Sequence, residues 1–137
     1  MTDLVRLSLS IEKKLYVKLE GLVKKSGYRN RSEYVRDMIR DQLVKEKWAR
    51  HQEVVATLTI IYNHHKRELS EKLTELQHSY HDLVLAATHV HLSEHICAEM
   101  IMLRGQAEQV KNLADLLGQQ VGVLHFGLTM STTGEEL

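Results

Sequence analysis

Apolar and polar residues alternate strictly near the N-terminus and then recur at helical spacing. The alternating apolar residues share one face of a predicted strand and are Val5, Leu7, Leu9 and Ile11. Apolar residues then return every three or four positions in two amphipathic stretches. The first stretch contains Leu15, Leu19, Leu22 and Val23, and the second contains Val35, Met38, Ile39 and Leu43. The sequence therefore predicts a strand followed by two helices.

Local sequence signals mark the ends of these helices. The small size of the strand and two helices together predicts a dimer. Gly27 after Ser26 is typical of the end of a helix. Asn30 with Glu33 three residues later resembles a capping box at the start of the next helix, and Ser32 is the other candidate for the N-cap. One strand and two helices leave a strand edge unpaired and hold little core. We therefore expect residues 1–50 to form a domain that pairs strand with strand in a second copy.

A second pattern occupies residues 51–137. A strand at 54–62, a helix through Leu69 and Tyr80, strands at 83–92 and 96–103, a helix after Gly105 and a strand at 121–128 are predicted. This βαββαβ order is that of a ferredoxin-like, ACT-like domain, with two helices on one face of a four-stranded antiparallel sheet. The polar tail, residues 129–137, is expected to be loose. The fold class is thus α+β.

Composition and charge narrow the range of functions. The chain has 137 residues, of which 43% are hydrophobic and 26% charged, which excludes a large multidomain enzyme and a disordered polyelectrolyte. No apolar stretch approaches the roughly 20 residues that span a bilayer, so we expect a cytoplasmic protein without a membrane partner. Residues 1–53 carry a net charge of +5 and residues 54–137 a net charge of −5. The basic block suggests a part that approaches phosphates.

Histidines gather in the second block. Of nine in the chain, seven lie between His64 and His95. Strand alternation puts His89 and His91 on one face, and a turn returns Cys97 close to them on the next strand. With His78, these side chains offer three imidazoles and a thiolate. A planar arrangement of such donors suits Ni(II) or Cu(II) and a tetrahedral one suits zinc, and the spacing does not choose between them.

The first block resembles the ribbon-helix-helix DNA-binding domain, with residues 27–33 as the segment between its helices. The resemblance implies that Arg6, Ser8 and Ser10, on the polar face of the strand, read base edges in the major groove. The amide groups near Arg31 and Ser32 would contact phosphate. The alternative is that the polar residues are the solvated face of an edge strand. The two following helices and the positive charge favour DNA readout.

Across nearly the whole chain, the sequence resembles the NikR family of nickel-responsive regulators. Its pattern is found in Gln77-His78 with His81-Asp82, in residues 88–91 and in residues 97–99. The resemblance implies a homotetramer, a dimer of dimers, with one Ni(II) ion per subunit in a square-planar site. His89, His91 and Cys97 of one subunit and His78 of another would be the ligands.

The same resemblance suggests further roles. Glu99 shares the strand face of Cys97 and would support a metal ligand. Lys66 and Arg67 would approach the DNA backbone, although they are as compatible with a solvated surface. Glu33 and Asp37 would hold an additional cation, although an exposed pair of like charge is the more common meaning of such a spacing.

Together these features predict a repressor of nickel-uptake genes in which Ni(II) promotes binding to a palindromic operator in double-stranded DNA. Four protein ligands would fill a four-coordinate site, so we expect no enzyme. The alternatives are a ribbon-helix-helix regulator that senses another metal or a small molecule, and a metal-storage protein. Sensing of a small molecule leaves the histidine and cysteine spacing unexplained, and storage leaves Arg6, Ser8 and Ser10 without a role.

Overall fold

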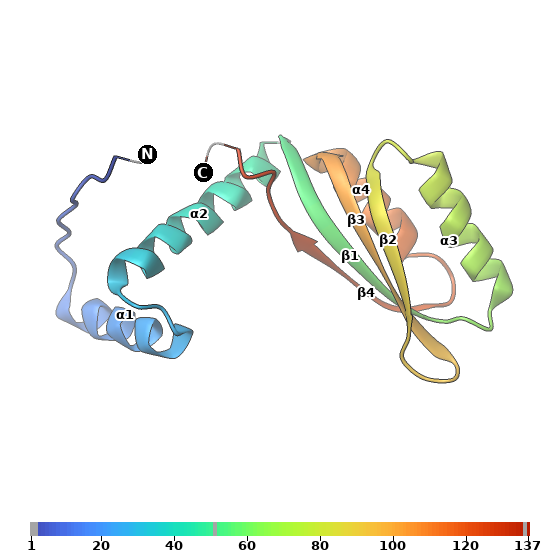
Figure 1. Ribbon diagram of the computed structural model, residues 1–137, viewed down its shortest axis with the longest axis horizontal. Helices are drawn as coiled ribbons and strands as arrows, with labels where there is room; N and C mark the ends of the chain where they lie inside the picture. Colours follow the sequence, from blue (N-terminus) through green and yellow to red (C-terminus); the bar gives the residue numbers. More distant parts are fainter. Residues whose placement is uncertain (1–2, 51, 136) are drawn as a thin grey trace. The chain divides into compact units, whose positions relative to one another are not determined.

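The chain forms two compact units, one up to Asp41 and the other from Gln42 onward (Figure 1). The computed structural model describes residues 3–50, 52–135 and 137. Among these residues, no helix is long and apolar enough to cross a membrane. Helix α2 begins in the first unit and ends in the second.

Helix α1 ends and helix α2 begins where local sequence signals predict. Helix α1 spans Lys13–Ser26 and ends at Gly27, whose φ of 77° lies in the left-handed region that favours glycine. Helix α2 spans Arg31–Ala49. The Asn30 Oδ1 atom accepts a hydrogen bond of 3.0 Å from the Glu33 amide, so Asn30 caps the helix.

Residues 3–12 do not form the predicted strand within one chain. They lie outside helix and strand, and all of them are exposed. The alternating apolar side chains remain in solvent, with Leu7 74% and Leu9 67% exposed. A strand needs a partner to receive its backbone hydrogen bonds, and none of the described strands of this chain takes that place. The expected partner is a second copy.

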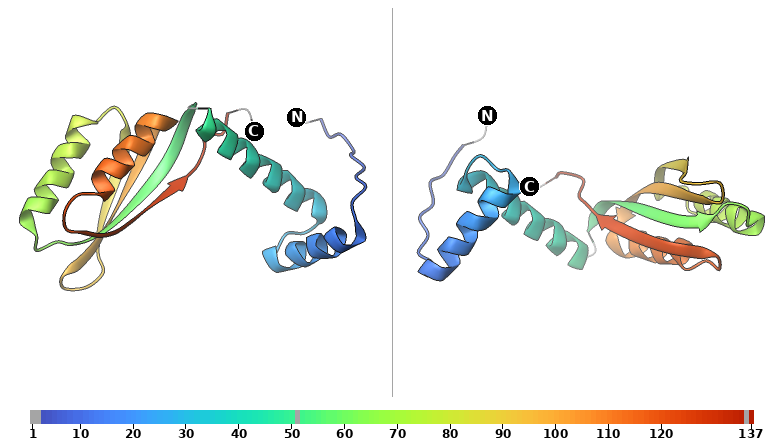
Figure 2. Two further views of the ribbon diagram at one scale, coloured as in Figure 1. Left: turned by 180° about the vertical axis from the view of Figure 1, so that it is seen from behind. Right: turned by 90° about the horizontal axis from the view of Figure 1, so that it is seen from below.

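The second unit has the predicted βαββαβ order. Its elements are β1 (Glu53–Asn63), α3 (Arg67–Ser79), β2 (Val84–His91), β3 (Ile96–Gln106), α4 (Ala107–Gly118) and β4 (Val123–Met130). The strands pair antiparallel in the order β2-β3-β1-β4. Both helices lie on the same face of this sheet (Figure 2). The ferredoxin-like prediction is confirmed.

The core lies between this sheet and its helices. Every second residue of β1, from Val54 to Tyr62, is almost fully buried. These side chains pack against Leu69 and Leu73 of α3 and against the inward residues of α4. The pattern follows from strand alternation, which sends neighbouring side chains to opposite faces. The helix-covered face also carries the histidines of β2.

The described residues 131–135 of the C-terminal tail are held by hydrogen bonds, contrary to the expectation from its polar composition. The Ser131 carbonyl oxygen accepts a hydrogen bond of 2.9 Å from Trp48 Nε1, and the Glu135 carbonyl oxygen accepts one from Lys47 Nζ. The prediction was wrong because the partners of the tail are its backbone carbonyl groups, which side-chain polarity does not reveal.

Candidate metal centre

Strand pairing brings three of the predicted ligands to one corner of the sheet. In the antiparallel register of β2 and β3, His91 lies opposite Cys97 and His89 lies opposite Glu99. The two imidazole rings of β2 have their centroids 5.2 Å apart. All four side chains belong to the face that the helices cover, because Cys97 pairs with the buried Tyr62 of β1. The register therefore places two imidazoles and a thiol side by side.

The Cys97 thiol is fully buried, whereas His89 and His91 are exposed. Its Sγ lies 3.6 Å from the Tyr62 carbonyl oxygen, to which it donates. Burial raises the pKa of the Cys97 thiol. A thiol must lose its proton to become a metal ligand, so metal binding at this position would release a proton.

Glu99 connects His89 of β2 to helix α3. Its Oε1 atom lies 3.6 Å from His89 Nδ1 and accepts a hydrogen bond of 3.4 Å from the Tyr62 hydroxyl. Its Oε2 atom accepts one of 2.5 Å from Gln77 Nε2 on α3. Burial and the charge of Glu99 raise the pKa of Tyr62, which keeps its hydroxyl a donor. The sequence predicted no role for Tyr62 or Gln77. The position of Gln77 directly before the predicted ligand His78 was the one signal that pointed to it.

His78 is exposed at the C-terminal end of α3. Its carbonyl oxygen lies 3.3 Å from the His81 Nδ1 atom. In the part of the chain that the structure describes, no three His, Cys, Asp or Glu side chains are already arranged to hold a metal ion. The donor types nevertheless fit a late first-row divalent metal. One chain thus supplies neighbouring donors without a closed site.

Further histidines extend from His91 along the neighbouring turns. The ring of His64, after β1, lies 4.8 Å from that of His91 and 4.3 Å from that of His65. His65 in turn lies 4.8 Å from His95 in the turn between β2 and β3. Burial, followed by the neighbouring histidines, lowers the pKa of His64. These contacts place His64 beside the predicted ligand His91, with His65 one ring further away.

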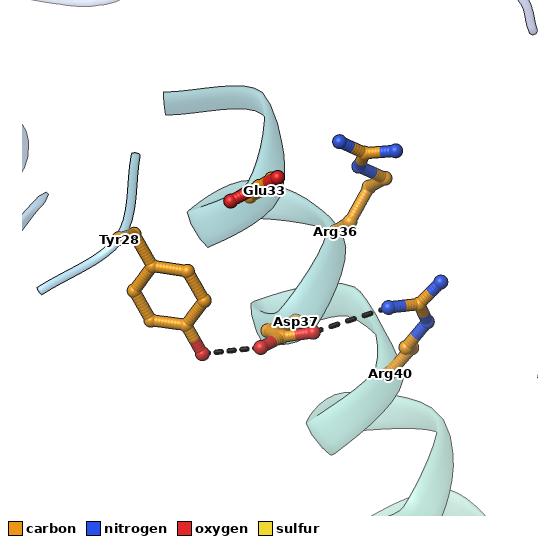
Figure 3. Close-up of a pocket in the computed structure, with 5 residues that line it drawn as sticks. All are labelled: Tyr28, Glu33, Arg36, Asp37 and Arg40. Atoms are coloured by element: carbon orange, nitrogen blue, oxygen red, sulfur yellow. Dashed lines mark hydrogen bonds and ion pairs between the residues drawn. The ribbon is translucent and has the colours of Figure 1, made fainter. Parts of the chain in front are cut away.

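The predicted second cation pair lines a separate cavity on α2 (Figure 3). Asp37 accepts a hydrogen bond from the Tyr28 hydroxyl, and its Oδ1 atom lies 3.2 Å from Arg40 Nη1. These two partners lower the pKa of the Asp37 carboxyl group, with the Tyr28 hydrogen bond as the larger cause. Glu33 and Arg36 also line the cavity. Asp37 therefore already has a hydrogen-bond donor and an ion-pair partner within the chain.

The predicted DNA-contacting residues are accessible. Arg6, Ser8 and Ser10 are exposed in the segment before α1, and Ser32 is exposed in the first turn of α2. The Arg31 guanidinium is held against α1, because its Nε lies 3.2 Å from Glu20 Oε1 and its Nη1 donates to the Tyr16 hydroxyl at 3.0 Å.

Lys66 and Arg67 lie at the start of α3. Lys66 is the N-cap residue and is exposed. Arg67 Nε lies 3.2 Å from Glu71 Oε1, in an ion pair on the solvent-facing surface. An exposed pair of this kind holds its arginine only weakly, so Arg67 is free to exchange partners.

Comparison with known proteins now identifies both units. Residues 5–46 match the ribbon-helix-helix proteins of the copG family, and residues 55–131 match the NikR C-terminal nickel-binding domain. This chain belongs to the NikR family. With a DNA-binding and a nickel-binding domain in one chain, it is a nickel-responsive transcriptional regulator, as the resemblance predicted.

Relatives match along the full length of the NikR-family chain. A protein of Geobacter sulfurreducens, whose name describes it as a nickel-responsive regulator, is 49% identical over 100% of this chain and 99% of its own. One of Pyrococcus horikoshii with the same name is 42% identical over 98% of this chain and 99% of its own. An uncharacterized protein from Thermotoga maritima, with a solved structure, has a TM-score of 0.52 and 19% identity, and covers 58% of this chain and 98% of its own. That last likeness concerns the fold alone.

Proposed function

We propose that each subunit binds one Ni(II) ion through His89, His91 and Cys97 of one subunit and His78 of another. The observation that carries this proposal is the register of β2 and β3, which sets His91 opposite Cys97 and, two pairs further along, His89 opposite Glu99. His78 lies on a different element and is exposed, so it is available to a neighbouring subunit. The ion would supply a link between subunits that the metal-free protein lacks.

Glu99 is the supporting residue of this centre. A carboxylate next to a ligand imidazole fixes its orientation and raises its basicity. The Glu99 carboxylate lies 3.6 Å from His89 Nδ1 and also receives the Gln77 amide, one residue before His78. Glu99 therefore links His89 to helix α3 of its own chain, whose His78 would serve the centre of a neighbouring subunit.

The first unit supports DNA readout by a dimer. Pairing of two segments around residues 5–11 would bury their exposed apolar side chains and turn Arg6, Ser8 and Ser10 outward. Arg6 can pair bidentately with guanine, and serine hydroxyls can donate or accept. The backbone amides near Arg31 and Ser32 would contact phosphate, with Lys66 and Arg67 approaching the DNA backbone.

Two such dimers in one tetramer would engage the two half-sites of a palindromic operator. Ni(II) favours this arrangement, and DNA tightens Ni(II) binding by the same factor, because linkage acts in both directions. The protein would act in the cytoplasm as a repressor of nickel-uptake genes. A cation at Glu33 and Asp37 would compete with Arg40 for the Asp37 carboxylate.

A subunit-mixing experiment tests the shared centre. His78→Ala and Cys97→Ala are each expected to lose the nickel–thiolate absorption band. When the two variants are unfolded together and refolded as mixed oligomers, intact centres form from Cys97 of one chain and His78 of the other, so the band returns. A mixture that stays without the band would place all four ligands in one subunit and contradict the proposal. Refolding of each variant alone is the matched control.

A further inference from the structure

The described part of the C-terminal tail crosses the end of helix α2. We call residues 131–135 the strap. The Ser131 carbonyl oxygen accepts the Trp48 indole N–H at 2.9 Å, while the Ser131 amide donates to the Val55 carbonyl oxygen at 2.8 Å. The Glu135 carbonyl oxygen accepts a hydrogen bond from Lys47 Nζ. The strap therefore contacts the last turn of α2 and the beginning of β1 at once.

These contacts satisfy buried polar groups. Trp48 is 8% exposed and Lys47 is 9% exposed, and Trp48 belongs to the core of the second unit. Val44, one turn earlier on α2, packs against the same core. A buried indole N–H or ammonium group without an acceptor is costly, so the strap carbonyl groups are needed for this helix end to stay buried.

The strap has a defined local conformation. The Thr132 hydroxyl accepts a hydrogen bond of 3.2 Å from the Gly134 amide, and the Thr133 hydroxyl accepts one of 3.5 Å from the Glu135 amide. Gly134 has a φ of 88°, in the left-handed region that L side chains rarely adopt. These short-range bonds direct the Glu135 carbonyl group toward Lys47.

We propose that the strap is a coupling device that holds the last turn of α2 in the metal-binding unit. Helix α2 is continuous from Arg31 to Ala49, so a change of the metal-binding unit that moves this turn also acts on the helix that begins in the DNA-binding unit. A released helix end would fray, because its last carbonyl groups lack partners within the helix. The inference rests on the proposed nickel-dependent DNA binding.

The first test is deletion of residues 131–137 from the full chain. Trp48 is the single tryptophan, so its fluorescence quenching by acrylamide reports whether the helix end is released. We expect quenching to rise and nickel affinity to stay at the parent value. The factor by which Ni(II) tightens binding to operator DNA should fall by about fivefold or more, a fall within the usual range of coupling between sites.

A point substitution separates coupling from folding. Gly134→Ala strains the strap at a positive φ without removing any contact residue. Gly127→Ala is the matched control, because it makes the same chemical change in β4, where an added Cβ would meet only His125 Cε1, at 4.0 Å. We expect Gly134→Ala to weaken the nickel-dependent tightening and Gly127→Ala to leave it unchanged.

Three outcomes would overturn the proposal. The first is unchanged Trp48 quenching after the deletion, and the second is an exposed Trp48 with nickel-dependent tightening as in the parent. The third is a loss of nickel affinity in Gly134→Ala, which would make the strap a structural support of the centre. A parent protein whose DNA binding ignores Ni(II) would instead refute the proposed function, and Trp48 quenching would still decide whether the strap holds α2.

Discussion

The two units of this chain differ in how much of their apolar surface they bury. In the metal-binding unit, Leu58, Ile60 and Ile101 have no exposed area, whereas in the DNA-binding unit Leu7 and Leu9 are 74% and 67% exposed. Burying one such side chain contributes about 1.5–3 kcal/mol, so the difference is large in energy. The metal-binding unit builds its core within one chain. The DNA-binding unit leaves the apolar side chains among residues 5–11 in solvent, which is why we expect a second copy to cover them.

The largest effect is expected from shortening a core side chain. Leu58→Ala should lower the free energy of unfolding of the metal-binding unit by about 2–5 kcal/mol, because it leaves a cavity between sheet and helices. Trp48 fluorescence during urea unfolding, at one fixed protein concentration, measures this change. Leu9→Ala is the control, and we expect it to weaken self-association in sedimentation while the Trp48 transition stays in place. Equal shifts in both variants would contradict the difference between the units.

Removing one of the proposed nickel ligands should make DNA binding independent of nickel. His89→Ala and Cys97→Ala should abolish the nickel-dependent tightening of DNA binding, a loss of about 1–3 kcal/mol if the coupling is of ordinary size. His125→Ala, which removes an exposed imidazole of β4 outside the proposed centre, is the matched control and should behave as the parent does. Fluorescence anisotropy of a labelled duplex measures the effect. If the Cys97→Ala protein, in the presence of nickel, binds the duplex as tightly as the parent does, the mechanism is refuted.

Arg6→Ala should give the converse result. We expect a loss of about 1–3 kcal/mol in operator binding, because a base contact is removed, with the nickel absorption unchanged. Lys25→Ala removes one positive charge from α1 and should weaken binding to operator and scrambled duplexes alike. If Arg6→Ala lowers the affinity for the operator and the scrambled duplex equally, Arg6 has only a general electrostatic role.

The smallest effect concerns the cap of α2. Asn30→Ala removes the acceptor of the Glu33 amide and should lower the stability of the DNA-binding unit by about 1 kcal/mol. Ser32→Ala should cost less, because Ser32 lies inside the first turn. Thermal unfolding followed by circular dichroism compares them. A larger loss for Ser32→Ala would transfer the capping role to that residue.

Features fixed by neighbouring residues could be predicted from the sequence. Helix ends at Gly27 and Asn30 depend on one or two residues, and the strands of the sheet follow from alternation. The placement of His89, His91 and Cys97 side by side also followed from alternation and a short turn. The roles of Tyr62 and Gln77 could not be predicted, because they arise where β1 and α3 meet Glu99 across the fold.

Two predictions went wrong or stay open for related reasons. The tail was expected to be loose because its side chains are polar, but the buried Trp48 and Lys47 bind its backbone carbonyl groups. Residues 5–11 form no strand in the described chain, so the expected pairing with a second copy stays a prediction. In the first case the deciding partners are distant in sequence, and in the second the expected partner is another molecule.

The central claim is that Ni(II) in the second unit controls DNA binding by the first. The most direct test is anisotropy of a duplex from upstream of the gene for this protein or of a nearby nickel-transport operon, at one fixed salt concentration, with metal-free protein and with one Ni(II) per subunit. We expect nickel to tighten binding to this duplex about fivefold or more and to leave a scrambled duplex unaffected. Equal affinity with and without nickel, in protein that has demonstrably bound the metal, would contradict the account.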